Sequence, residues 1–278
     1  MTRLGATALA AVLLIGTTVF PAVSQTLRLE GPLIQGGLLI GHTDPGSVVT
    51  VDGTETQVSR GGLFAIGLGR DAPSTVKVRV ATTDGSTTAR DLKIERRRYD
   101  IQRIDGLPKK QVAPSAEDLK RIGDDSRRIA AVRADASALT DFAGGFAWPL
   151  AGRLSGVFGS QRILNGEPRR PHAGVDVAAP QGTPVKAPAD GVVALTHGDM
   201  FFTGKTLMID HGHGLNSVYA HMSAIEVEQG QRVLKGQIIG RVGATGRATG
   251  PHLHWGVSLF DIALDPALLA GSMTPPVP

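Results

Sequence analysis

Residues 250–255, Gly-Pro-His-Leu-His-Trp, place two histidines two positions apart in a region of short segments separated by Gly and Pro. Side chains at positions i and i+2 of a β-strand point to the same face of the sheet, so the rings of His252 and His254 can reach one point in space. From residue 150 onward the sequence shows no helical period of useful length. This half is therefore predicted to be a compact all-β domain, with short strands expected around 182–185, 190–193, 206–209, 217–221, 230–233 and 237–240.

Two further stretches bring chemically active side chains to the same half of the chain. Residues 170–176 read Arg-Pro-His-Ala-Gly-Val-Asp, and residues 219–221 read Tyr-Ala-His. Because the chain has no Cys, a metal ion here must be held by His and carboxylate side chains. A catalytic zinc takes three protein ligands and keeps one position open for water. Spacing alone does not assign the roles of the five candidates, which are His172, Asp176, His221, His252 and His254.

These stretches resemble the motifs of lysostaphin-type (LytM-like) zinc metalloendopeptidases, which act on bacterial peptidoglycan. The resemblance covers about residues 147–267. Its flanks agree as well, at residues 158–159, 182–187, 190–193 and 243–246. The resemblance implies one Zn²⁺ per chain, with His172, Asp176 and His254 as ligands. It also implies that His221 and His252 lie near the scissile carbonyl, one of them acting as general base and both stabilising the oxyanion.

The same resemblance implies the substrate. Family members cut peptide cross-links of peptidoglycan, some at glycine bridges and others at D-alanyl–diaminopimelate links, and by analogy we expect the second kind. Some relatives have lost the site residues and only activate other wall hydrolases. A non-catalytic, wall-binding activator is therefore the alternative, although all five positions are retained here. In the polar stretch 160–171, no residue can be aligned with a substrate-contacting aromatic residue of the family. The resemblance therefore predicts neither the shape of the cleft nor its bond specificity.

The N-terminus predicts export. Residues 1–24 hold one charge, Arg3, followed by an apolar run and small residues at positions 22 and 24, which predicts a signal peptide and a mature chain beginning at Gln25. An uncleaved anchor is the alternative. No second long apolar stretch follows, so no membrane span is expected after cleavage, and the protein is expected to be periplasmic or secreted. The net charge of +4 suits an anionic cell envelope, while scarce aromatics argue against nucleic acid as a partner.

The remainder of the chain predicts a second domain and a connector. Residues 25–98 alternate short strands with Asp-Gly and Pro-Gly turns, which predicts an antiparallel β-sandwich. Residues 99–146 are expected to be a linker containing an amphipathic helix at about 115–140, with Ser115 and Asp118 forming a capping box. Residues 268–278 are expected to be a flexible tail. A regulatory protein could dock on residues 25–140. His211 and His213 are expected in a tight turn, away from the metal.

Overall fold

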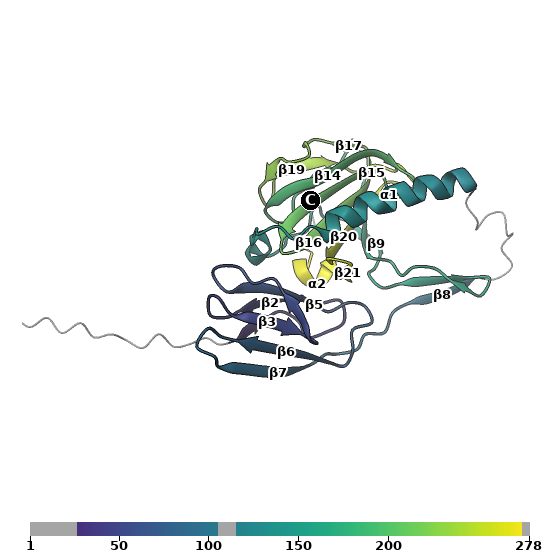
Figure 1. Cartoon of the computed structure of the whole chain (residues 1–278). Coiled ribbons are helices and arrows are strands. Elements are labelled where there is room, and N and C mark those ends of the chain that lie inside the picture. The colour runs from purple at the N-terminus through teal and green to yellow at the C-terminus, as the bar shows by residue number, and fades with distance from the viewer. Residues whose placement is uncertain (1–26, 105–114, 274–278) are drawn as a thin grey trace, which may run out of the picture.

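The computed structural model describes residues 27–104 and 115–273, and its two β units lie against each other (Figure 1). The expected signal peptide, residues 1–24, and part of the expected linker, residues 105–114, lie outside the described residues. The prediction of a mainly β fold is confirmed. No helix of the described segments combines the length and the apolar character that a bilayer crossing requires.

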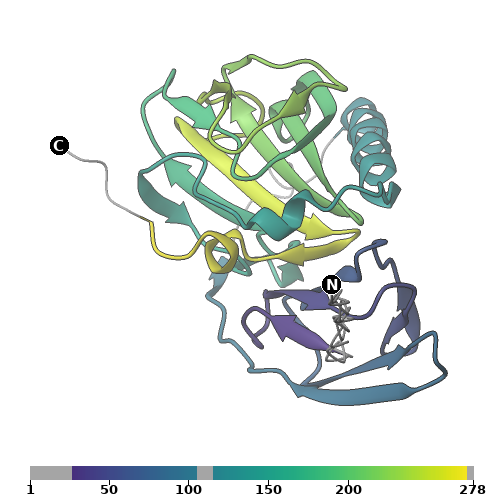
Figure 2. The same cartoon turned by 90° about the vertical axis from the view of Figure 1, so that its left-hand side faces the viewer.

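The N-terminal unit consists of two antiparallel sheets packed face to face (Figure 2). Strand β6 shows why: Val76, Val78 and Val80 are buried and alternate with exposed residues, as expected for a strand with one face in a core. Apolar side chains from both sheets meet in one cluster. The first sheet holds β1 (Arg28–Glu30), β2 (Leu38–His42) and β5 (Leu63–Gly67), and the second holds β3 (Val48–Val51), β4 (Thr54–Thr56), β6 (Thr75–Ala81) and β7 (Thr87–Lys93).

The C-terminal unit is built on a larger sheet of eight strands. Seven follow the order β18-β14-β15-β16-β20-β12-β9, and β21 pairs with β20. These are β9 (Arg153–Gly156), β12 (Gly174–Ala178), β14 (Gly191–Met200), β15 (Gly204–Gly212), β16 (Leu215–Met222), β18 (Arg232–Val233), β20 (His252–Leu259) and β21 (Ile262–Leu264). A small sheet of β13 (Pro184–Lys186), β19 (Ile238–Arg241) and β17 (Ala224–Ile225) packs against it, and their shared core contains the fully buried Trp255 and Tyr219.

One part of the expected linker is a strand. Residues 101–104 form β8 (Ile101–Ile104), which pairs in parallel with β10 (Gln161–Leu164). Strand β10 lies in the polar stretch 160–171. Strand β10 pairs in turn with β11 (Glu167–Pro168). Asn165 and Gly166, with φ of 50° and 81°, make the two-residue turn between β10 and β11, as the Asn-Gly pair favours. Residues 101–104 of the expected linker, 99–146, are therefore a strand that pairs with the C-terminal half.

The helix is shorter than the periodicity suggests. Helix α1 (Ala116–Ala134) has the predicted capping box, with Ser115 and Asp118 each bonding to the backbone of the other, but it ends six residues before the expected 140. Ile129 and Val132 pack against a small cluster on the C-terminal sheet formed by Leu195, Met200 and Met208. The backbone of Phe201 also donates a hydrogen bond to Asp125 on the helix. The helix is thereby fixed to β14 and its neighbours (Figure 1).

The boundaries predicted for the C-terminal domain are also too narrow. Phe142, in the 3-10 helix η2 (Asp141–Gly144), and Phe146 belong to its core, although both were expected in the linker. At the other end, helix α2 (Pro266–Ala270) runs into the expected tail. The Trp148 indole donates to the carbonyl of Gly271, so this segment is held in place by packing and hydrogen bonding. The expected tail, 268–278, thus begins inside α2 and includes a residue that Trp148 contacts.

A salt bridge joins the two units beside α2. The Arg97 guanidinium bonds to Asp265 at 2.7 Å, and the Asp265 side chain is only 5% exposed. The other Asp265 oxygen accepts from the backbone of Ala267 and caps α2. The guanidiniums of Arg70 and Arg97 both lie over the Tyr99 ring, 4.5 and 5.3 Å from its centroid. Leu38 and Ala65 of the N-terminal unit also join the C-terminal core.

Candidate metal centre and catalytic cleft

Three adjacent strands carry most of the predicted site residues. Asp176 on β12 pairs directly with His254 on β20, and His254 pairs on its other side with Ala220 of β16, next to His221. His252 precedes His254 by two positions on β20, so the expected same-face arrangement holds and both rings line one cleft. His172 lies in the loop before β12. The sheet thus brings together residues that are up to 82 positions apart in the sequence.

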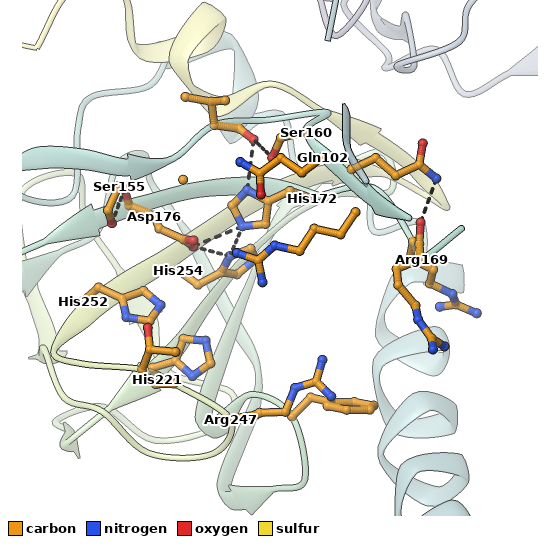
Figure 3. A pocket seen from close by; sticks show the side chains of 18 of the residues that line it. Gln102, Ser155, Ser160, Arg169, His172, Asp176, His221, Arg247, His252 and His254 are labelled. Atoms are coloured by element: carbon orange, nitrogen blue, oxygen red, sulfur yellow. Dashed lines mark hydrogen bonds and ion pairs between the residues drawn. The ribbon is translucent and has the colours of Figure 1, made fainter. Parts of the chain in front are cut away.

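His172, Asp176 and His254 point their ligand atoms at one another (Figure 3). The His172 Nε2 atom is 3.1 Å from Asp176 Oδ1 and 3.0 Å from His254 Nδ1, and the last two atoms are 2.9 Å apart. Tetrahedral ligands about 2.0–2.1 Å from a zinc ion are separated by about 3.3–3.4 Å. Lone pairs of two neutral imidazoles and a carboxylate repel each other at this distance unless a cation lies between them. The donor set therefore fits a metal ion.

The surroundings of this group fix its orientation. The Nδ1–H of His172 donates to the carbonyl of Val157 at 3.1 Å, which leaves Nε2 free to bind metal. Gly156 lies opposite Asp176 on the neighbouring strand β9. A Cβ at residue 156 would lie 2.3 Å from the Asp176 Oδ2 atom, so only glycine leaves room for the carboxylate in its present position.

The charge of Asp176 governs the ionisation of the whole group. Burial alone would raise the pKa of Asp176, but hydrogen bonds from His172 and His254 outweigh it and hold that pKa well below its usual range. Burial lowers the pKa of His254. For His172, burial opposes the charged form, yet the hydrogen bond and charge of Asp176 prevail and raise the pKa. The carboxylate is thus ionised, and it favours positive charge at the centre of the group.

His221 and His252 form a second pair beside the first. Their ring centroids are 4.7 Å apart, and that of His221 is 6.3 Å from His254. The Nδ1–H of His221 donates to the carbonyl of Thr245, and that of His252 donates to the carbonyl of Gly250, both at 2.8 Å. Each ring therefore keeps its Nε2 available as a base or, once protonated, as a donor. Burial lowers the pKa of His221, which favours the neutral form.

The backbone of His221 is strained. Its φ is +63°, in the left-handed region that residues other than Gly, Asn and Asp rarely adopt. A hydrogen bond from its backbone N–H to the carbonyl of Thr203 holds this conformation. Strain of this kind persists where the surrounding structure imposes it, and it clusters at functional sites.

The other two histidines of interest are structural. His211 lies in strand β15 rather than in the expected turn, and His213 occupies the turn between β15 and β16 with a φ of 53°. The fully buried His211 bonds through Nδ1 to the carbonyl of Asp190 and through Nε2 to the Ser217 hydroxyl. His213 packs on the ring of Phe142. Neither belongs to the His172, Asp176 and His254 group.

All five predicted site residues line one cleft of about 840 Å³. The hairpin of β10 and β11 and the loop before β20 form parts of its wall, and four arginines line it: Arg162, Arg169, Arg170 and Arg247. None of these arginines was predicted as a site residue from the sequence. Three of them fall in the polar stretch 160–171, and this run of polar residues was the one sign of them in the sequence. The stretch reaches the cleft through the pairing of β10 with β8, which the sequence does not reveal.

Comparison with known proteins gives a consistent match to this half of the chain. Residues 170–266 match the model of Peptidase family M23. A "DD-carboxypeptidase/endopeptidase Mpg" of Neisseria meningitidis is 43% identical over 118 residues, which are 42% of this chain and 27% of that protein. The "Peptidoglycan DD-endopeptidase ShyA" of Vibrio cholerae is 45% identical over 104 residues, 37% of this chain and 24% of that protein. The chain thus spans about a quarter of the length of these curated relatives.

A solved structure matches both units. It comes from Pseudomonas aeruginosa and carries the description peptidase M23. It is 34% identical in sequence, with a TM-score of 0.65, and the match covers 86% of this chain and 95% of that one. The N-terminal sandwich and the C-terminal sheet therefore occur together in another member of the same fold family.

Proposed function

The chain belongs to peptidase family M23, and we propose that it is an exported, zinc-dependent endopeptidase that hydrolyses peptide cross-links of bacterial peptidoglycan. The observation that carries the proposal is the group of His172, Asp176 and His254, which offers three converging ligand atoms beside a second pair of histidines in an open cleft. Three protein ligands with one open position are typical of catalytic zinc.

We assign a role to each of the five residues, and their positions support the assignment. His172, Asp176 and His254 hold the metal through Nε2, Oδ1 and Nδ1. Zinc at such a site supplies a Lewis acid and lowers the pKa of water bound to it. His221, kept neutral by burial, accepts a proton at Nε2 from the attacking water. His252, whose Nδ1–H donates to the Gly250 carbonyl, faces the scissile carbonyl with its Nε2 and donates to the oxyanion once that nitrogen carries a proton.

The substrate class rests on the relatives. Two relatives of 43% and 45% identity carry names that include DD-endopeptidase or DD-carboxypeptidase/endopeptidase, which supports a D-alanyl–diaminopimelate link as the bond cut by this chain. Peptidoglycan lies outside the cytoplasm. This agrees with the signal peptide predicted for residues 1–24 and with a periplasmic or secreted location.

Release of soluble fragments from dye-labelled, purified peptidoglycan tests the proposal against the activator alternative. We expect the purified protein alone to release dye, and His252→Ala to reduce the rate by about 10²–10⁴-fold. An activator would release dye only when a second hydrolase is added. Wall binding without release by the zinc-loaded protein, and full stimulation by His252→Ala, would refute catalysis.

A further inference from the structure

The cleft carries an excess of positive charge that the metal site does not explain. We call Arg162, Arg169, Arg170 and Arg247 the cleft arginines. The carboxylates that line the same cleft belong to Asp100 and Asp176, and Asp176 is engaged with His172 and His254. Within residues 27–104 and 115–273, none of the cleft arginines takes part in a salt bridge, whereas Arg97, Arg121, Arg232 and Arg241 each do. Their charge is available to a ligand.

Two of these arginines flank the catalytic residues from different elements. Arg162 lies on β10, and the backbone next to it is tied to the site, because the His172 N–H donates to the carbonyl of Ser160. Arg247 lies in the loop before β20, and its guanidinium rests over the Phe202 ring, 4.8 Å from the centroid. Two residues earlier, the Thr245 carbonyl accepts the His221 hydrogen bond. Figure 3 shows Arg169 and Arg247 around the open space that the histidines face.

Planar guanidinium groups pair with carboxylates through two parallel N–H···O bonds. In a D-alanyl–diaminopimelate link, the carbon that bears the acylated amine also bears a free carboxylate, directly beside the scissile amide. A bond inside a glycine bridge has no charged group on either side. The two kinds of cross-link named for this family therefore differ in the chemistry that unpaired arginines recognise.

We propose that Arg162 and Arg247 are specificity residues that pair with substrate carboxylates around the scissile amide and so select an anionic cross-link over a neutral one. The inference rests on the proposed function, because it concerns the same cleft. Arg169 and Arg170, further along the hairpin, extend the positive surface and attract the anionic peptide to the cleft.

A pair of cross-linked peptides of nearly the same shape but different charge tests the role of the two arginines. They are identical except that the diaminopimelate carboxylate beside the scissile amide is free in one and converted to the carboxamide in the other. We expect kcat/KM of the zinc-loaded, wild-type protein to be about 5- to 20-fold higher for the free acid, the range of a few charge-assisted hydrogen bonds at a partly exposed site. Arg162→Gln and Arg247→Gln should each lower this ratio, and the double variant should bring it close to one.

A matched control removes the same charge elsewhere. Arg79 is exposed on β6 of the N-terminal unit, away from the cleft, and Arg79→Gln should keep the wild-type ratio. A wild-type ratio of one would overturn the inference. So would equal losses for both peptides in the double variant, because a purely structural role lowers both rates and leaves the ratio unchanged.

Binding provides a second measurement that does not depend on turnover. Titration calorimetry with the metal-free, full-length protein should give tighter binding of the free acid than of the carboxamide, and the double variant should abolish the difference. If neither peptide is cleaved but the binding difference holds, the proposed function fails and the role of the arginines stands. If both are cleaved and bound equally, the role of the arginines fails and the proposed function stands.

Discussion

At the scale of single residues, Asp176 and His221 contribute different things to the cleft, and substitution separates them. His221→Ala removes a base that holds no metal in the proposed mechanism, so it should retain about one zinc per chain while losing about 10²–10⁴-fold in rate. Asp176→Ala removes a ligand and should lose the metal itself. Elemental analysis beside a turnover assay checks both. Metal loss in His221→Ala, or full loading of Asp176→Ala, would contradict the assignment.

Gly156 tests how tightly the metal site is packed. Because a Cβ at this position would lie 2.3 Å from Asp176 Oδ2, Gly156→Ala should displace the carboxylate and weaken zinc affinity by about 10- to 100-fold. Competition with a zinc chelator measures the affinity. Gly198→Ala is a matched control, since Gly198 is exposed and a Cβ there meets nothing within 4 Å. Equal affinities in the two variants would show that the carboxylate can move at no cost.

The pH dependence of the rate reports on His221. Burial lowers its pKa, so the neutral base persists below the ordinary value of about 6.5. We expect kcat/KM to stay level from neutral pH to below 6.5 and to fall only at more acidic pH, as the imidazole becomes protonated. Zinc content measured at each pH separates this effect from metal loss. A decline centred above pH 6.5 with zinc still bound would contradict the role of His221 as the base.

The chemistry-bearing residues could be singled out from sequence because each lies in a short local motif. The identities of His172, Asp176, His221, His252 and His254 are visible in three stretches, and strand periodicity places His252 and His254 on one face. Their convergence is not visible, because it depends on the pairing of β12, β16 and β20. The contribution of the Thr245 carbonyl and the need for glycine at 156 depend on the same tertiary contacts and could not be predicted.

At the scale of elements, β8 supports the hairpin that carries Arg162. Proline at positions 102 and 103 removes two backbone donors from β8 and disturbs its pairing with β10. Gln102→Pro/Arg103→Pro should therefore reduce the preference for the free-acid peptide, as Arg162→Gln does. Gln102→Ala/Arg103→Ala removes the same side chains, keeps the donors and is the matched control. Equal preferences in the proline and alanine variants would show that β8 does not position the hairpin.

Most strands were predictable and β8 was not, for a physical reason. Strands such as β3 and β6 can be predicted because apolar and polar residues alternate along them and turn residues adjoin them. Strand β8 is only four residues long, reads Ile-Gln-Arg-Ile without alternation, and forms by pairing with β10, about 60 residues further on. The end of α1 has a similar cause. Leu139 continues the helical period, but its backbone lies against Gly212 near the β15–β16 turn, so the chain leaves the helix at Ala134.

At the scale of the whole molecule, the two units are joined by a contact whose loss should be costly. Arg97→Ala leaves the nearly buried Asp265 carboxylate without its charged partner and should lower the free energy of unfolding by about 2–4 kcal/mol. Arg127→Ala removes the exposed pair with Asp124 on α1 and should cost less than about 1 kcal/mol. Urea unfolding measures both. Similar small losses in the two variants would mean that the contact between the units adds little stability.

In the proposed function, this chain cuts peptide cross-links by a zinc-dependent reaction in the cleft of His172, Asp176 and His254. Mass spectrometry of the fragments released from purified peptidoglycan tests it most directly, with untreated protein, with chelator, and with chelator followed by zinc. We expect new termini at D-alanyl–diaminopimelate links that disappear with chelator and return with zinc. Absence of new termini from the zinc-loaded protein, or release that chelator does not affect, would contradict it.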